Sequence, residues 1–169
     1  MARAQTLRLT QPGFTAPFGA QVGQWCRITV ADDARIVLGA RAIIDDGVTL
    51  AAGTGSRMEI GAQSFIGHHS TIAAAESVRI GIGTFLAELV SVRDHDHDET
   101  RPFFGGGQVT EPVTIGDDCW LASKVTVCRG ASIGNGVIVG ANSVVRGTIE
   151  ADGVAVGSPA VVRRWRRRS

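Results

Sequence analysis

The chain has 169 residues, a formal net charge of +1, 22 glycines, 5% aromatic residues and no tyrosine. No apolar run approaches the roughly 20 residues that cross a bilayer, and the opening residues lack a secretory leader, so we expect a cytoplasmic protein without membrane contact. Three cysteines at irregular spacings fit neither a zinc ribbon nor a redox pair. Arginines are concentrated in the last seven residues, but one short terminal basic run argues against a nucleic-acid partner.

An aliphatic residue recurs every six positions through most of the chain. Six is a multiple of the strand period of two, so each unit turns the same face inward, which a helix of 3.6 residues per turn would not do. We predict an all-β fold in which each unit is a short strand and a corner, and three units close one coil of a triangular solenoid. The three interior columns are Leu38, Ile60, Ile80, Ile115 and Ile133; Ile44, Ile66, Leu86, Leu121 and Val139; and Leu50, Ile72, Val92, Val127 and Val145.

This periodicity divides the chain into three parts. Residues 1–21 are expected to form an N-terminal extension, residues 22–162 the solenoid domain, and residues 163–169 a basic tail. Within the solenoid, residues 93–112 are expected to form an inserted loop, because the six-residue period stops there.

Two outward columns differ in character. One carries large apolar residues at successive coils, namely Ile43, Phe65, Phe85, Trp120 and Ile138, and the other carries Thr49, Thr71, Ser91, Thr126 and Val144. A contiguous apolar stripe on a surface usually marks an interface. We therefore predict self-association through the apolar face.

The inserted loop contains the run Asp94-His95-Asp96-His97-Asp98. Long loops on rigid scaffolds often carry catalytic groups, and imidazole is the side chain suited to proton transfer near neutral pH. A hydrated acidic turn or a metal site is the alternative interpretation, because the run offers many ligands. His68 and His69 lie on a repeat unit and are interpreted as ordinary surface positions.

The run IGDDCWLASKVTVCRGASIGNGVIVGANSVVRG, followed by VAVGSPAVVRR, resembles the C-terminal half of the maltose, galactoside and xenobiotic O-acetyltransferases. These belong to the hexapeptide-repeat acyltransferases. The resemblance implies a left-handed parallel β-helix and a homotrimer with active sites between subunits. It also implies acetyl-CoA as acyl donor, a hydroxyl of a sugar-like small molecule as acceptor, and no required metal.

The resemblance assigns roles to residues of the loop. A histidine at the start of this loop is the general base in the family, and His97 with Asp98 is the pair that we match to it. His95 is the alternative base. Asp94 is expected, with Glu88 of the solenoid, to bind the acceptor.

Cofactor positions follow from the same resemblance. Trp120, Ser123 and Ala141 match positions along the pantetheine arm, and Arg164 matches a basic residue near the nucleotide. Arg146 stands where relatives often have lysine, and we expect it to bind the cofactor as well. Glu88 and Ser123 each lie two positions after a residue of the second interior column, so the repeat places them side by side on successive coils. The backbone amide of Ser123 is a candidate oxyanion donor.

Other functions fit parts of the pattern. A γ-type carbonic anhydrase has the same solenoid but needs three histidines around zinc. A noncatalytic β-helix that binds or assembles is a second alternative. Succinyl-CoA or another acyl-CoA as donor, or an amine as acceptor, is equally compatible with the repeat.

Overall fold

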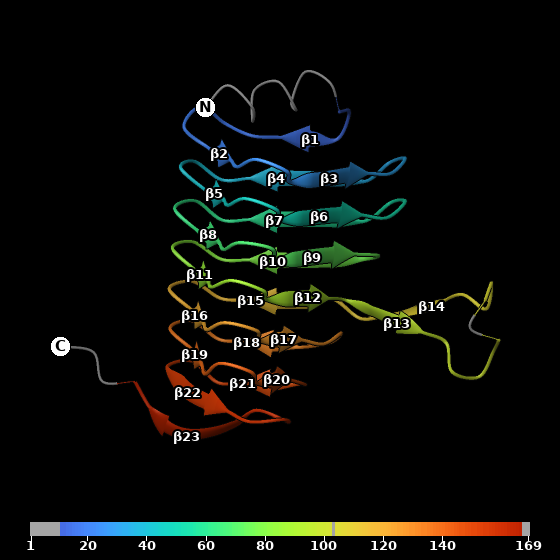
Figure 1. Ribbon diagram of the computed structural model, residues 1–169. Helices are drawn as coiled ribbons and strands as arrows, with labels where there is room; N and C mark the ends of the chain where they lie inside the picture. Colours follow the sequence, from blue (N-terminus) through green and yellow to red (C-terminus); the bar gives the residue numbers. More distant parts are fainter. Residues whose placement is uncertain (1–10, 103, 167–169) are drawn as a thin grey trace.

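The structure, a computed structural model, describes residues 11–102 and 104–166. In this part of the chain every regular element is a strand, and no helix is long and apolar enough to cross a membrane. The strands stack in successive coils around one axis, with a hairpin that projects from the side (Figure 1). The predicted parallel solenoid is confirmed.

Three sheets, parallel except for the last strand of one of them, form the sides of the prism among the described residues. Sheet A contains β1 (Phe14–Thr15), β4 (Arg35–Leu38), β7 (Arg57–Ile60), β10 (Ser77–Ile80), β15 (Val113–Ile115), β18 (Ser132–Ile133) and β21 (Thr148–Ile149). Sheet B contains β2 (Gln21–Val22), β5 (Ile43–Ile44), β8 (Phe65–Ile66), β11 (Phe85–Leu86), β16 (Trp120–Leu121), β19 (Ile138–Val139), β22 (Gly153–Val156) and β23 (Val161–Trp165). Sheet C contains β3 (Arg27–Val30), β6 (Thr49–Ala52), β9 (Thr71–Ala74), β12 (Ser91–Arg93), β17 (Thr126–Val127) and β20 (Val144–Val145).

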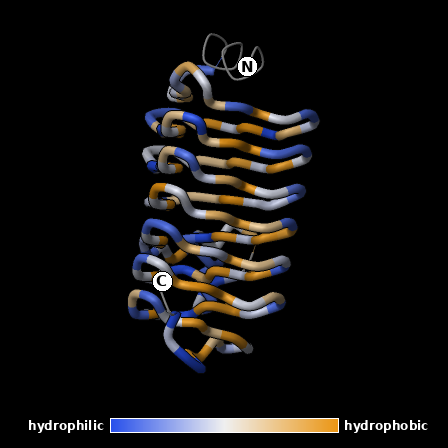
Figure 2. The backbone as a smooth tube through the Cα atoms, turned by 90° about the vertical axis from the view of Figure 1, so that its left-hand side faces the viewer, coloured by the Kyte–Doolittle hydropathy of each residue, from blue (hydrophilic) through white to orange (hydrophobic). Residues whose placement is uncertain are grey.

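The six-residue period sets the register between coils. Each strand pairs with the strand one coil away, so that Ile80 lies between Ile60 and Ile115, and Leu121 pairs with Leu86. The three predicted interior columns are confirmed, and their residues fill a continuous buried core. Hydrophobic residues return at the same place in successive coils (Figure 2).

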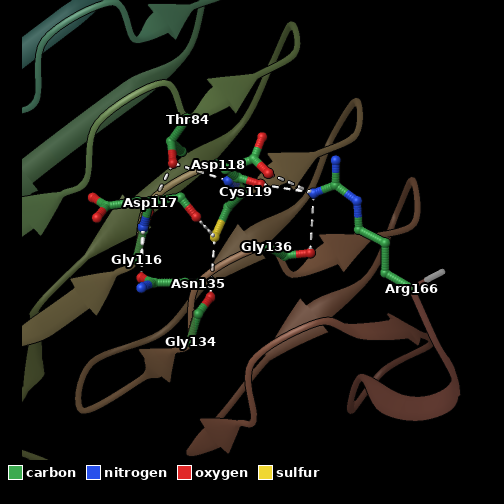
Figure 3. A network of polar contacts seen from close by, with 9 residues as sticks. All are labelled: Thr84, Gly116, Asp117, Asp118, Cys119, Gly134, Asn135, Gly136 and Arg166. Atoms are coloured by element: carbon green, nitrogen blue, oxygen red, sulfur yellow. Dashed lines mark hydrogen bonds and ion pairs between the residues drawn. The ribbon is translucent and has the colours of Figure 1, made fainter. Parts of the chain in front are cut away.

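Close stacking of the coils explains the glycines that follow the first interior column. A Cβ added to Gly61 would lie 2.5 Å from the carbonyl carbon of Gly81 in the next coil, too short for a real contact. Side chains complete the same turns: Asn135 Oδ1 accepts the amide of Asp117 at 2.8 Å (Figure 3). Glycine therefore lets the turns approach, and Asx side chains satisfy their backbone donors.

The solenoid is longer at both ends than its expected boundaries. β1 pairs with β4 and β2 pairs with β5, so the stack begins before residue 22. At the other end β23 reaches Trp165 and pairs antiparallel with β22, so the expected tail begins inside a strand. Residues 1–10 and 167–169 of these segments lie outside the described residues.

We expect Leu121→Ala to lower the free energy of unfolding by about 2–5 kcal/mol, because its fully buried side chain would leave a cavity between coils. Urea unfolding followed by circular dichroism measures the change. Thr148→Ala, at an exposed position of sheet A, should change the value by less than about 0.5 kcal/mol. Equal effects of the two substitutions would contradict the packing described.

Candidate functional site

The turns of the prism form three edges, which we name by the sheets they connect. In the coil that begins with β15, residues 116–119 make the A-to-B edge, residues 122–125 the B-to-C edge and residues 128–131 the C-to-A edge. The inserted loop leaves the prism at the C-to-A edge, between β12 and β15. It forms an antiparallel hairpin of β13 (His95–His97) and β14 (Gln108–Thr110), which projects from the stacked coils (Figure 1).

Asp94 lies fully buried at the root of this hairpin. Its carboxylate accepts the backbone amides of Ala75, Glu76 and Ser77 at 2.7–2.8 Å. Oδ1 also lies 2.9 Å from Nδ1 of His95. Because both oxygens of Asp94 already accept N–H groups, Nδ1 of His95 is the donor in this contact, and Nε2 is left as the basic nitrogen.

The surroundings of Asp94 differ from those expected of an acceptor-binding residue. The sequence predicts that Asp94 binds the acceptor, but the carboxylate is 0% exposed and faces donors of its own chain. A fully buried group bonded to an imidazole orients that imidazole. In this structure the Asp94 carboxylate therefore contacts amides of its own chain and the imidazole of His95.

Further contacts fix the hairpin from the coils above and below. Thr110 Oγ1 donates to Glu76 Oε2 at 2.7 Å. On the other side, Arg129 Nε donates to Asp96 Oδ2 at 3.2 Å, and its Nη1 lies 3.6 Å from Glu111 Oε2. The base of the hairpin, and with it His95, is held from both directions.

His97 has an exposed side chain farther along β13. It lines a hollow of about 450 Å³ with Asp96, Asp98, Glu99, Thr100, Val109, Arg129 and Arg146. Asp98, the expected partner of His97, accepts the hydroxyl of Thr100 at 2.6 Å and pairs with Arg101 Nε at 3.2 Å. The hydroxyl and amide of Thr100 lower the pKa of Asp98. The carboxylate of Asp98 is thus engaged within its own turn.

A second group of polar side chains lies at the B-to-C edge. The predicted stack of His68, Glu88, Ser123 and Ala141 on successive coils is confirmed by the backbone bonds between their turns. Ser123 Oγ donates to Glu88 Oε1 at 2.5 Å. This hydrogen bond is the main cause that lowers the pKa of Glu88, with help from its own backbone amide, Lys124 and His68. Glu88 is consequently a carboxylate at neutral pH, suited to accept a hydrogen bond.

One pair at this edge was missed by the sequence analysis. His68 Nε2 lies 3.0 Å from Asp45 Oδ2, one coil toward the N-terminus. Among the described residues, the ligand atoms of Asp45, Asp46 and His68 all lie within 4.8 Å of one another, whereas no such group forms around the hairpin histidines. The six-residue period could have predicted this neighbourhood, because Asp46 and His68 occupy the same column as Glu88. Exposed acidic groups of this kind are common without a metal, and we assign none to it.

The expected cofactor residues fall in two places. Trp120 is 48% exposed on the outward side of sheet B, and strand pairing continues its ladder through Ile138 and Val154 to Arg164. Ser123 and Ala141 lie on the adjoining B-to-C edge. Arg146, in contrast, lies at the C-to-A edge beside the hollow that contains His97. A single chain therefore does not bring Arg146 together with the other four.

Comparison with known proteins relates this chain to acyltransferases. The bacterial transferase hexapeptide family (six repeats) matches residues 112–147. An assigned acetyltransferase of Mycobacterium tuberculosis is 39% identical over 72 residues, which cover 41% of this chain and 24% of that protein. WbbJ of Escherichia coli, assigned as a lipopolysaccharide biosynthesis O-acetyl transferase, is 40% identical over 79 residues, which cover 41% of this chain and 40% of that protein. The chain thus spans about a quarter to two fifths of the length of these relatives.

Solved structures share the fold over nearly the whole chain. The N-acyltransferase AntD from Bacillus cereus, in complex with dTDP and 3-hydroxybutyryl-CoA, has a TM-score of 0.81 at 20% identity, covering 96% of this chain and 89% of that one. A maltose O-acetyltransferase from Clostridium difficile 630 has a TM-score of 0.65 at 24% identity, covering 98% and 75%. The left-handed parallel β-helix and the resemblance to hexapeptide-repeat acyltransferases are confirmed.

Removing the Ser123 hydroxyl should raise the pKa of Glu88 toward its ordinary value, because the largest contribution to the lowered value is lost. Side-chain carboxyl resonances followed by NMR during a pH titration of Ser123→Ala measure the shift. Ser91→Ala removes a serine hydroxyl from strand β12 of sheet C; it serves as the matched control and should leave the titration unchanged. An unaltered pKa in Ser123→Ala would show that the hydrogen bond does not form in solution.

Proposed function

We propose that this protein is a CoA-dependent O-acyltransferase that moves an acetyl group from acetyl-CoA to a hydroxyl of a sugar-like small molecule. The observation that carries the proposal is the His95 imidazole, oriented by buried Asp94 on a hairpin of a hexapeptide-repeat solenoid. The relatives support the reaction class, since they are named as O-acetyltransferases and N-acyltransferases.

His95 is our candidate for the general base in place of His97. Its Nδ1 proton is directed to Asp94, so that Nε2 is available to take the proton of an acceptor hydroxyl. The hydroxyl oxygen then bonds to the thioester carbonyl carbon, and the carbon–sulfur bond breaks. The imidazolium returns the proton to the leaving thiolate, which leaves His95 ready for another cycle. Asp94 favours the imidazolium that forms in between.

The donor fits the outward ladder of sheet B. From Trp120 to Arg164 the ladder contains three inter-strand steps, about 14 Å at roughly 4.8 Å each. It is apolar at Trp120, Ile138 and Val154 and cationic at Arg164. An extended acyl-pantetheine with a pyrophosphate at one end has the same order of apolar and charged parts. The guanidinium group of Arg164 is suited to bind the phosphate oxygens.

The acceptor fits the carboxylate of Glu88. It is held as an anion beside Ser123, where it accepts a hydrogen bond from a sugar hydroxyl. The backbone amide of Ser123 is our candidate donor to the oxyanion that forms on the thioester carbonyl.

A complete site requires more than one copy of the chain. His95 lies at the C-to-A edge, whereas Glu88 and Ser123 lie at the B-to-C edge, at the opposite ends of the strands of sheet C. In a ring of three copies related by rotation, each contact joins two different surfaces of the chain. The aromatic ladder of sheet B, in which Phe65 and Phe85 stack at 4.6 Å, is complementary to the small Thr, Ser and Ala side chains of sheet C. We infer a homotrimer in which the hairpin of one copy completes the site on its neighbour.

His95→Ala should lower kcat for acetyl transfer by about 10²- to 10⁴-fold, the contribution of a positioned base, while the Kd for CoA changes little. Acetyl-CoA consumption with a panel of sugar acceptors, and calorimetry with CoA, provide the two readouts. His97→Ala should cost less than His95→Ala. If His97→Ala is the more damaging change, the base is His97; if neither alters turnover, the histidine mechanism is wrong.

Phe85→Glu should convert the trimer to monomers, because it places a charge in the apolar ladder. Light scattering gives the molar mass, and acetyl transfer should fall with it since each site needs two copies. Thr148→Glu, on sheet A, introduces the same charge away from the proposed contact and should keep the trimer. A Phe85→Glu protein with the mass of the unaltered protein would contradict this interface.

A further inference from the structure

The C-terminal strand β23 is tied to the solenoid by one arginine. Where β23 ends, the amide of Arg166 donates to the carbonyl of Asp152 at 2.6 Å. Its Nη1 lies 3.0 Å from the carbonyl oxygen of Asp118, 3.1 Å from Oδ2 of the same residue, and 3.3 Å from the carbonyl oxygen of Gly136. Arg166 thus contacts the A-to-B turns of three successive coils. Figure 3 shows its contacts with Asp118 and Gly136.

These contacts set Arg166 apart from its basic neighbours. Its side chain is 30% exposed and binds two backbone carbonyls that cannot move away without disturbing the coils. Arg163 is exposed at the irregularity where the pairing of β22 and β23 shifts by one residue. Arg164 is also exposed, and its pairing partner Val154 extends the Trp120 ladder.

The strand needs such a tie because it is the last one of sheet B. Among residues 11–102 and 104–166, β23 has a neighbouring strand only on one side, at β22. Its pairing with β22 is broken by the register shift between Val154 and Ala155. An edge strand of this kind frays easily at its free end. Arg166 sits at that end, two residues beyond Arg164.

We propose that Arg166 is a positioning residue for the acyl donor: by holding the end of β23 against Asp118 and Gly136, it fixes Arg164 at the foot of the sheet B ladder. This inference rests on the proposed function, in which Arg164 binds the phosphates of CoA. Without the tie, the strand end must be ordered each time CoA binds, which weakens binding but leaves the acyl-transfer step itself unchanged.

The test compares CoA binding and kinetics in a set of variants of the full chain. Arg166→Ala should raise the KM for acetyl-CoA and the Kd for CoA about three- to tenfold, the cost of ordering one side chain and its strand end, with kcat unchanged. Arg166→Lys retains a cation that can reach one of the carbonyl oxygens, so the KM and the Kd should rise less than in Arg166→Ala. Arg163→Ala removes an equal charge from the same strand without touching the tie and should show no rise.

A double variant separates positioning from general stability. Because Arg166 acts through Arg164, adding Arg166→Ala to Arg164→Ala should raise the KM no further than Arg164→Ala alone. Full additivity of the two changes, or a Kd in Arg166→Ala equal to that of the unaltered protein, overturns the inference while the proposed function stands. Unaltered protein that binds no CoA by calorimetry overturns the proposed function, and the inference with it.

Discussion

Hydrogen bonding between strands one coil apart is the constraint on which the rest of the structure depends. Since each coil repeats the path of the one before, a residue has the same surroundings as its counterpart in the next coil, and side chains act in columns. The interior columns form the core, the outward ladder of sheet B forms an apolar face, and the B-to-C edge forms a polar one. Even the hairpin depends on this stacking, because turns of the coils above and below hold it.

Features that follow from the period could be predicted from the sequence. Counting in sixes was enough to assign the interior columns and to place Glu88 beside Ser123, although these residues are far apart in the chain. The same count predicts the aromatic ladder, because the register of parallel strands leaves no freedom once the corners are fixed. In such a fold, sequence position converts directly into spatial position.

Features that depart from the six-residue period could not be predicted from the sequence. The burial of Asp94 depends on the path of the hairpin, which turns the carboxylate toward three amides of a different coil. Sequence alone shows alternating Asp and His and does not reveal which imidazole has a buried partner. The antiparallel return of β23, and the reach of Arg166 to Asp118, likewise depend on a reversal that interrupts the repeat.

The uniform step between coils makes the solenoid a molecular ruler. Trp120 and Arg164 are separated by a whole number of strand spacings. In the proposed function, the distance between the sites for the thioester and for the phosphates is therefore set by the number of coils between these two residues. One additional coil would lengthen that distance by about 4.8 Å. Residues added to the tip of the hairpin would leave it unchanged. The hairpin that carries His95 can therefore vary in length and sequence while the proposed donor site retains a fixed dimension.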